Sequence, residues 1–337
     1  MDTYSSVSVL QTYVRTLVEH DYESGKLGKC FASSNSPSSV PEIDLVLDGG
    51  AFNGGYTLGA LMYVKYAESR GYLRVCRISG CSVGACVGLT YRLNKLEEMI
   101  SILTKFMDLF RKKSNMTFYK QFVTEFVDLL LDEEGLKKCQ NNLYISCFNK
   151  NKEKQIVVSS YPTKEDLLLA ILRTIYIPFL SNDSPTDTEG YVDGGYPHLF
   201  RGSLEVKGRK QMYIQLNGID KILNMIHIKS ENSIVNRMTR GLEDIRTFVQ
   251  RSGEPTFMCS FVEKWNPIDS ALYNSKPFFC NAVLSIYHFL NNYYSKIPIT
   301  MKSKVNTLFA LDSSSNAVDA ASKLLNKMLE HSISKIV

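Results

Sequence analysis

Short apolar runs and amphipathic segments alternate along the first half of the chain. "IDLVLD" (43–48) is an apolar run too short for a helix and is followed by glycines, which is typical of a buried strand. After a glycine turn, "YTLGALMYVKYAESRG" (56–71) carries apolar residues at helical spacing and ends on a glycine. "LRVCRIS" (73–79) and "VGACVGLTYRL" (83–93) repeat the order of strand, glycine turn and helix. This repeat predicts a parallel sheet built from βαβα units.

The rest of the chain adds helices and further strands to this sheet. Residues 5–20 predict an N-terminal amphipathic helix, and the apolar-periodic stretches 94–113 and 117–131 predict a helical insertion or cap. Further strands are expected at 143–149, 155–160, 211–217 and 256–262, and a further helix at 163–175. The pattern as a whole indicates one continuous α/β domain with a helical C-terminal part.

A stretch rich in serine, asparagine and proline marks one boundary. "ASSNSPSSVP" (32–41) has the composition of a flexible linker. We therefore expect an N-terminal helix and linker over 1–41 and an α/β domain over 42–310. A C-terminal amphipathic helix is expected over 311–337.

Composition places the chain among ordinary globular proteins. Of its 337 residues, 44% are hydrophobic and 22% are charged. The start lacks a basic cluster followed by an apolar core, and no window has the length and apolarity of a membrane span. The eight cysteines are scattered without a CxxC pair, which favours reduced thiols and disfavours a zinc site. We expect a cytoplasmic protein that can attach peripherally to membranes.

The positive charge is concentrated in the C-terminal part. The net charge is +5, and residues 201–337 carry 18 lysines and arginines against 11 acidic residues. Such a part can favour an anionic bilayer surface, while a solvated surface with no partner is the simpler alternative. No stripe of basic residues interleaved with aromatics suggests a nucleic-acid partner.

One serine lies in a pattern that is typical of nucleophiles. "GCSVG" (80–84) matches G-x-S-x-G between a predicted strand and a predicted helix, with Ser82 at its centre. Gly80 and Gly84 fit a turn so tight that a neighbouring Cβ would collide with the strand or the helix. The pattern is short, so an ordinary serine in a glycine-rich turn is the alternative. The context favours a nucleophile elbow.

A second glycine turn, "DGGAFNGG" (48–55), follows the preceding strand. Successive glycines allow backbone N–H groups to point into a common space, as an oxyanion hole requires. A dinucleotide fingerprint is disfavoured because Ala51 stands at its middle glycine and the second strand ends without an acidic residue. The N–H groups of the oxyanion hole are expected to come from Gly49, Gly50, Ala51 and Val83.

A candidate base lies in "GYVDGGYPHLF" (190–200). Asp193 can face Ser82 as a Ser–Asp dyad, provided that partial desolvation raises its pKa toward neutrality. In a Ser-His-Asp triad the base is a histidine, and His198 is the histidine near these motifs. An Asp-Gly pair is also a common hairpin turn. The dyad is the more economical interpretation.

The three motifs in this order resemble the patatin-like phospholipase family over about residues 43–200. The family has a DGGG/GGGxRG turn, a G-x-S-x-G elbow and a later D-G-[GA]; "TIYIPFL" (174–180) also resembles its Ala-Ser-x-x-x-Pro segment without the Ala-Ser. The resemblance implies a three-layer α/β/α fold with a mostly parallel sheet and a Ser82–Asp193 dyad. It also implies phospholipase A-type hydrolysis of membrane lipid esters without a metal or cofactor. The motif glycines are Gly54, Gly80, Gly84, Gly194 and Gly195.

Two positions depart from the family pattern. Ala51 replaces the third oxyanion glycine but still offers a backbone N–H, whereas Asn53 replaces a basic residue and removes a positive charge. These departures support one alternative, a catalytically silent lipid-binding or scaffolding protein. The other alternative is an esterase that uses His198 as its base.

Overall fold

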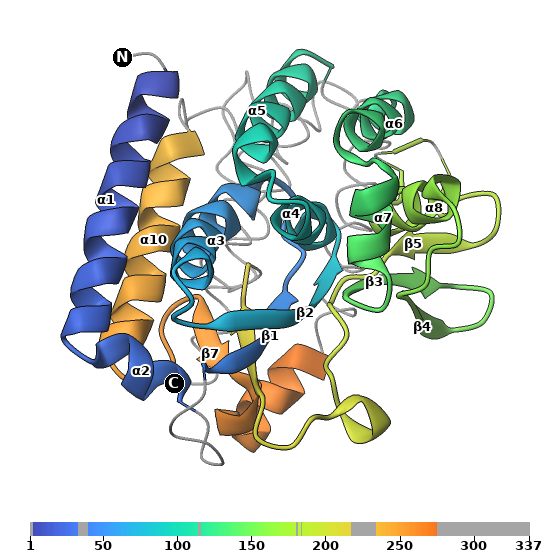
Figure 1. Ribbon diagram of the computed structural model, residues 1–337. Helices are drawn as coiled ribbons and strands as arrows, with labels where there is room; N and C mark the ends of the chain where they lie inside the picture. The colour runs from blue at the N-terminus through green and yellow to red at the C-terminus, as the bar shows by residue number, and fades with distance from the viewer. Residues whose placement is uncertain are drawn as a thin grey trace, which may run out of the picture.

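A mixed sheet of seven strands runs through the centre of the protein (Figure 1). The structure is a computed structural model that describes residues 3–32, 40–113, 116–179, 181–182, 184–216 and 234–274. The strands are β1 (Glu42–Leu47), β2 (Arg74–Cys81), β3 (Leu143–Asn149), β4 (Lys154–Val158), β5 (Tyr191–Asp193), β6 (Lys210–Ile214) and β7 (Cys259–Phe261). Their order is β4-β3-β2-β1-β6-β7, and β5 pairs with β3. Strands β3, β2, β1 and β6 run parallel, whereas β4, β5 and β7 are antiparallel to their neighbours.

Helices follow most of the strands. They are α1 (Thr3–Glu23), α2 (Lys26–Phe31), α3 (Gly54–Ser69), α4 (Val83–Arg92), α5 (Leu96–Lys113), α6 (Tyr119–Leu130), α7 (Glu133–Cys139), α8 (Lys164–Thr174) and α10 (Ile234–Gln250). Residues 267–274 form a further helix. Single 3₁₀ turns are η1 (Ala51–Asn53), η2 (Gly202–Leu204) and η3 (Val262–Lys264). Helix α8 begins with a capping box between Thr163 and Asp166, which fixes its first turn. Among the described residues, no helix combines the length and apolarity needed to cross a membrane.

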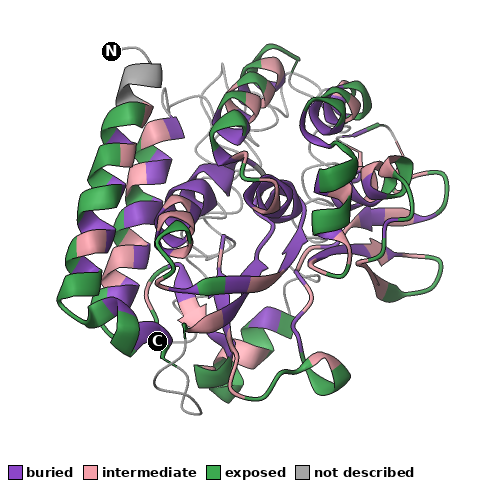
Figure 2. Ribbon diagram, viewed as in Figure 1, coloured by how far each residue is buried: buried purple, intermediate pink, exposed green. Residues whose placement is uncertain are grey.

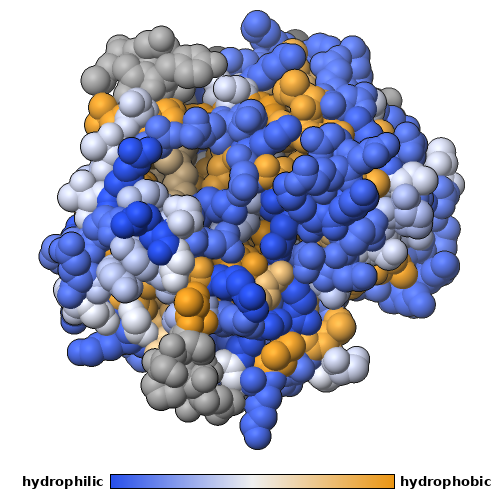
Figure 3. Space-filling view, viewed as in Figure 1, coloured by the Kyte–Doolittle hydropathy of each residue, from blue (hydrophilic) through white to orange (hydrophobic). Residues whose placement is uncertain are grey.

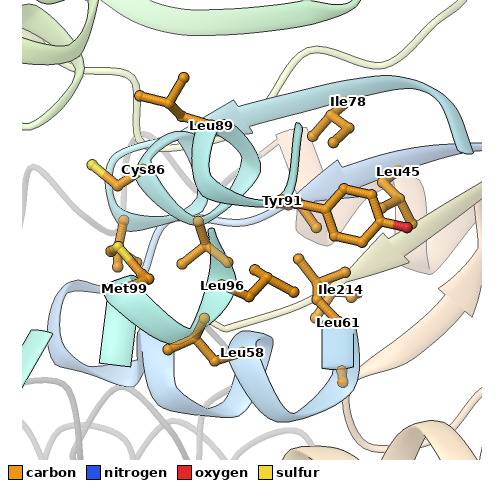
Figure 4. Packing of buried hydrophobic residues seen from close by; sticks show 14 of the residues in the cluster. Leu45, Leu58, Leu61, Ile78, Cys86, Leu89, Tyr91, Leu96, Met99 and Ile214 are labelled. Carbon is orange, nitrogen blue, oxygen red and sulfur yellow. The ribbon is translucent and has the colours of Figure 1, made fainter. Parts of the chain in front are cut away.

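Alternate strand residues face two separate cores. In β1, Leu45 and Leu47 join the large core under the helices, whereas Val46 faces the opposite side of the sheet. Helices α1, α3, α4 and α10 cover the first side, and η2 with the 267–274 helix lies on the second (Figure 1). Figure 2 shows the buried strands and α4 between more exposed outer helices, and Figure 4 shows the packing of the large core. The expected three-layer α/β/α fold is confirmed.

Helix α10 lies directly on α3, and glycines permit the approach. A Cβ on Gly59 of α3 would overlap the carbonyl oxygen of Met238 in α10. A Cβ on Gly241 of α10 would likewise overlap the carbonyl oxygen of Tyr56 in α3. The two backbones are therefore in contact where the helices cross, with no side chain between them.

The N-terminal helix packs into the same core. Leu10, Val14 and Val18 of α1 are buried against the helices of the domain. Asp21 of α1 is also buried and accepts a hydrogen bond of 2.9 Å from the Tyr63 hydroxyl of α3. The sequence assigns this helix to a segment of its own, yet it shares the interior of the α/β domain. Most of the expected linker and the whole expected C-terminal helix lie outside the described residues.

The expected elements match the structure closely in the first half of the chain and less closely near 256–262. The predicted strand at 143–149 has the bounds of β3, whereas β7 is limited to three residues. The Asp244 carboxylate of α10 accepts hydrogen bonds from the Thr256 hydroxyl and the Met258 N–H. These contacts hold the residues that precede β7 against the helix. The sequence pattern does not predict β5, α2 or α7.

Candidate active site

Ser82 occupies a sharp turn between β2 and α4. Its φ is 51° and its ψ is −132°, a region that residues other than glycine rarely adopt. The Ser82 carbonyl accepts hydrogen bonds from the N–H groups of Ala85 at 3.0 Å and Cys86 at 3.3 Å. These bonds begin α4 immediately after the serine. The strained backbone is held by the strand on one side and the helix on the other.

The two glycines around Ser82 are required by crowding. A Cβ on Gly80 would lie 2.7 Å from the Ala85 nitrogen. A Cβ on Gly84 would lie 2.5 Å from the carbonyl oxygens of Leu47 and Asp48. Any larger residue at either position would separate α4 from β1 and β2. This is the crowding that the G-x-S-x-G spacing predicts.

The glycine turn after β1 lies beside Ser82. Strands β1 and β2 are parallel with Leu47 opposite Gly80, so both strands end at the same edge of the sheet. A Cβ on Gly49 would lie 3.1 Å from the Ser82 Cβ. Within the described part of the chain, no hydrogen bond uses the N–H groups of Gly49, Gly50 or Val83. The turn after β1 and the start of α4 therefore offer uncommitted donors next to the serine.

Strand β3 brings Asp193 to Ser82. Cys81 of β2 is opposite Ser146 of β3, and Asp193 of β5 is opposite the next residue, Cys147. Ser82, which follows β2, and Asp193, which ends β5, consequently lie next to each other along the same edge of β3. The Ser82 side chain faces the Asp193 carboxyl group closely enough to lower its pKa. The N–H of Gly195 donates to the same carboxylate at 2.9 Å.

The surroundings of Asp193 raise its pKa. The residue as a whole retains intermediate exposure, but burial of its carboxyl group raises the pKa from 3.8 to about 6. The Ser82 side chain and the hydrogen bond from the Gly195 N–H lower the pKa, whereas the negative charge of Asp48 raises it. A carboxyl group with this pKa is ionised at neutral pH and is basic enough to accept a proton from a serine in a transition state.

Thr174, at the end of α8, supports the turn and is not among the residues that sequence reasoning singles out. The Ser82 N–H donates to the Thr174 hydroxyl oxygen at 2.8 Å, and this hydroxyl donates to the Ser146 carbonyl at 2.5 Å. The threonine thereby ties the serine to β3. Its signal in the sequence is a hydroxyl residue four positions before Pro178, in the segment that resembles the family's Ala-Ser-x-x-x-Pro.

An apolar pocket opens next to Ser82. Residues of the glycine turn after β1, α4, α5 and α6 line it, together with a segment after α8. The lining includes Phe52, Ser82, Cys86, Leu103, Phe122 and Ile175. Helices α5 and α6 are the helical cap that the sequence predicts over 94–131. Figure 3 shows a mainly hydrophilic face, with hydrophobic side chains reaching the surface in its upper part.

His198 lies apart from this arrangement. Its ring stacks on Tyr144 at 6.5 Å between centroids and meets Phe200 edge-on at 5.9 Å, on the second side of the sheet. Burial lowers the pKa of His198, and the charge of Arg77 lowers it further. Among the described residues, its Nε2 has no hydrogen-bond partner. The structure brings together Ser82 and Asp193 and does not bring His198 to them.

The chain is similar to known proteins over the segment that holds these features. Residues 45–198 match the model of the family described as patatin-like phospholipase. The human protein named patatin-like phospholipase domain-containing protein 4 is 23% identical over 216 residues. This alignment covers 56% of the chain and 85% of the human protein. All three motifs lie within the matched segment.

Proposed function

Residues 45–198 match the model of the patatin-like phospholipase family, and on this basis we propose that the protein is a serine lipid acyl hydrolase of the phospholipase A type. The observation that carries the proposal is that Ser82, on a strained turn beside an apolar pocket, faces a carboxyl group, that of Asp193, whose pKa is raised to about 6. A nucleophile, a base of suitable pKa and room for an acyl chain are the parts that ester hydrolysis needs.

In the proposed mechanism, Asp193 accepts the hydroxyl proton while Ser82 Oγ attacks the ester carbonyl carbon. The carbonyl oxygen becomes an oxyanion, which the N–H groups of Gly50, Ala51 and Val83 stabilise. One such donor contributes about 3–4 kcal/mol in comparable sites. The protonated Asp193 then gives its proton to the leaving alcohol oxygen, and the ester bond breaks to leave an acyl-enzyme. Water activated by Asp193 releases the fatty acid and restores Ser82.

The proposed substrates are membrane lipids. The pocket beside Ser82 is lined by aliphatic and aromatic side chains, which suits an acyl chain. Lysines accompany the aromatic residues of the cap, with Lys105 5.9 Å from the Phe122 ring centroid and Lys113 5.5 Å from that of Phe118. These ammonium groups support peripheral attachment to an anionic bilayer from the cytoplasmic side. Activity on anionic vesicles should then fall steeply as salt is raised, and a flat salt response would remove this part of the proposal.

Fatty-acid release from phospholipid vesicles tests the proposal. Wild type should release fatty acid, whereas Ser82→Ala and Asp193→Asn should each lose at least about a thousandfold because each removes a reacting group. His198→Ala is the matched control and should keep wild-type activity.

Three results would contradict the dyad. Loss of activity in His198→Ala with substantial activity left in Asp193→Asn would support the histidine-based esterase. Folded wild type that binds vesicles without releasing fatty acid would support the silent lipid-binding alternative. Release that persists in Ser82→Ala would reject Ser82 as the nucleophile.

A further inference from the structure

A buried arginine from a distant part of the chain lies against the oxyanion turn. Arg237 of α10 is fully buried, and its Nη1 donates hydrogen bonds to the Phe52 carbonyl and, at 3.2 Å, to Asn53 Oδ1. We propose that Arg237 is a positioning residue for the turn Ala51–Asn53 and supplies from α10 the positive charge that residue 53 lacks. This role rests on the proposed function, because the turn is the proposed oxyanion hole.

The crossing of α3 and α10 places Arg237 at the turn. A Cβ on Gly55, in the first turn of α3, would lie only 3.0 Å from the Arg237 Cβ. The backbone contacts at Gly59 and Gly241 continue the same approach along both helices. Because the helix backbones touch, the arginine side chain reaches back along α3 to its N-terminal end. The glycines of α3 and α10 thus bring Arg237 within reach of the turn at the start of α3, in addition to allowing tight packing.

The side chain of Asn53 is fitted to receive this arginine. Its Nδ2 donates to the Leu216 carbonyl at 3.3 Å, which orients Oδ1 to accept from Arg237. The Asn53 N–H donates to the Gly50 carbonyl at 2.8 Å and closes the turn. The turn is therefore held by its own backbone bond, by the segment that follows β6 and by the guanidinium of α10.

Anchoring the Phe52 carbonyl also orients the donors that precede it. In a helical turn the carbonyl groups point toward the C-terminal end and the N–H groups toward the N-terminal end. A cation fixed on the Phe52 carbonyl therefore keeps the N–H groups of Gly50 and Ala51 directed away from α3. The same buried charge favours an oxyanion forming nearby, since the surroundings screen it weakly.

Steady-state kinetics on a soluble short-chain ester test this role. Arg237→Met should lower kcat by roughly 30- to 100-fold with KM within about threefold of wild type, because the turn acts mainly on the transition state. Arg237→Lys keeps the charge with fewer donors and should lose less. Arg246→Met, which removes a partly buried arginine of α10 that pairs with Asp21, is the matched control and should leave kcat unchanged.

Relocating the charge separates positioning from simple packing. Asn53→Arg alone places two guanidinium groups together and should inactivate the enzyme. Adding Arg237→Gln to this variant should restore kcat at least about tenfold, since one arginine again serves the turn. Circular dichroism and thermal unfolding establish that each variant is folded, and the pair of substitutions remains informative if Arg237→Met does not fold.

The outcomes distinguish this role from the proposed function. An active wild type with unchanged kcat in folded Arg237→Met overturns the role of Arg237 alone. Absence of recovery in a folded Asn53→Arg/Arg237→Gln variant also overturns it. A wild type no more active than Ser82→Ala overturns the proposed function and, with it, this role.

Discussion

Ser82 and Asp193 both occupy states that cost folding free energy. Ser82 holds a positive φ that a serine seldom adopts, and Asp193 keeps a carboxyl group where burial raises its pKa. Such strain and such shifts collect at functional sites, where packing elsewhere offsets them. Their coincidence on two residues that face one another is what favours catalysis over a structural role.

The pKa of Asp193 predicts how activity depends on pH. The proposed base must be ionised, so kcat/KM should be low under acidic conditions, rise through a half-maximal value near pH 6 and level off above pH 7. The measurement is kcat/KM on an uncharged soluble ester between pH 4.5 and 8.5 at constant ionic strength. A profile that falls across this range would contradict a carboxylate base.

The same shift makes the ionised site unfavourable for stability. The folded-state pKa is raised, so the folded protein binds more protons than the unfolded chain between about pH 4 and pH 6. The contribution of Asp193 to stability is therefore present below this window and is lost as pH rises through it. At neutral pH, where the proposed base is ionised, the site therefore makes the folded protein less stable than it is under acidic conditions.

At single residues, the sequence predicts what local spacing determines. Ser82 with its two glycines and Asp193 are found from short patterns, because the turn sterics require those residue types. Thr174 and Arg237 contact Ser82 and Phe52 from distant parts of the chain, so no local spacing in the sequence predicts these contacts. From the sequence, Asn53 in place of a basic residue indicates a lost positive charge. In the structure, the Arg237 guanidinium donates a hydrogen bond to Asn53 Oδ1.

Helices α3 and α10 pack backbone against backbone because glycines at their crossing have no side chains. Gly59→Ala should destabilise the protein by about 3 kcal/mol or more, because the new methyl group would overlap the Met238 carbonyl and force the helices apart. Gly28→Ala in α2 is the control, since a Cβ there meets nothing within 4 Å. It should leave stability unchanged or raise it by up to about 1 kcal/mol.

Urea unfolding followed by circular dichroism measures both variants. Activity should fall with stability in Gly59→Ala, since the α10 arginine moves with its helix. Equal unfolding midpoints for Gly59→Ala and Gly28→Ala would show that the helix crossing is looser than described.

Among the elements, long segments with clear periodicity are predictable and short ones are not. β1 and β2, with the helices after them, follow from apolar runs and glycine turns. The three-residue strand β5 carries too few residues for a period, so its antiparallel pairing with β3 is visible only in the structure. The sequence therefore identifies Asp193 without showing how it reaches Ser82.

Across the whole molecule, the N-terminal helix is joined to the α/β domain through a buried polar contact. The Asp21 carboxylate accepts from the Tyr63 hydroxyl at 2.9 Å, and Arg246 of α10 lies 3.8 Å from the same carboxylate. Asp21 of α1 thereby contacts both α3 and α10, the two helices on which α1 packs. This arrangement predicts that α1 unfolds together with the domain and does not detach first.

Asp21→Ala tests this coupling. The substitution leaves the Tyr63 hydroxyl buried without its acceptor and should cost about 2–3 kcal/mol in the free energy of unfolding. Tyr63→Phe in the same chain should recover part of this loss, because the stranded hydroxyl is removed. Chemical unfolding of both variants, followed by far-UV signal and by proteolysis of the N-terminal segment, measures it. A separate early transition for α1 would contradict the coupling.

The pairing of both β2 and β5 with β3 determines where the chain tolerates changes in length. Ser82 follows Cys81, which is opposite Ser146, and Asp193 is opposite Cys147. The register of both residues is therefore set by their pairing with β3. An insertion between 143 and 147 would turn following side chains to the other face of the sheet and part the pair. An insertion in the 150–153 turn between β3 and β4 leaves that register intact. We therefore expect insertions to be tolerated in the 150–153 turn and not in the adjoining strand β3.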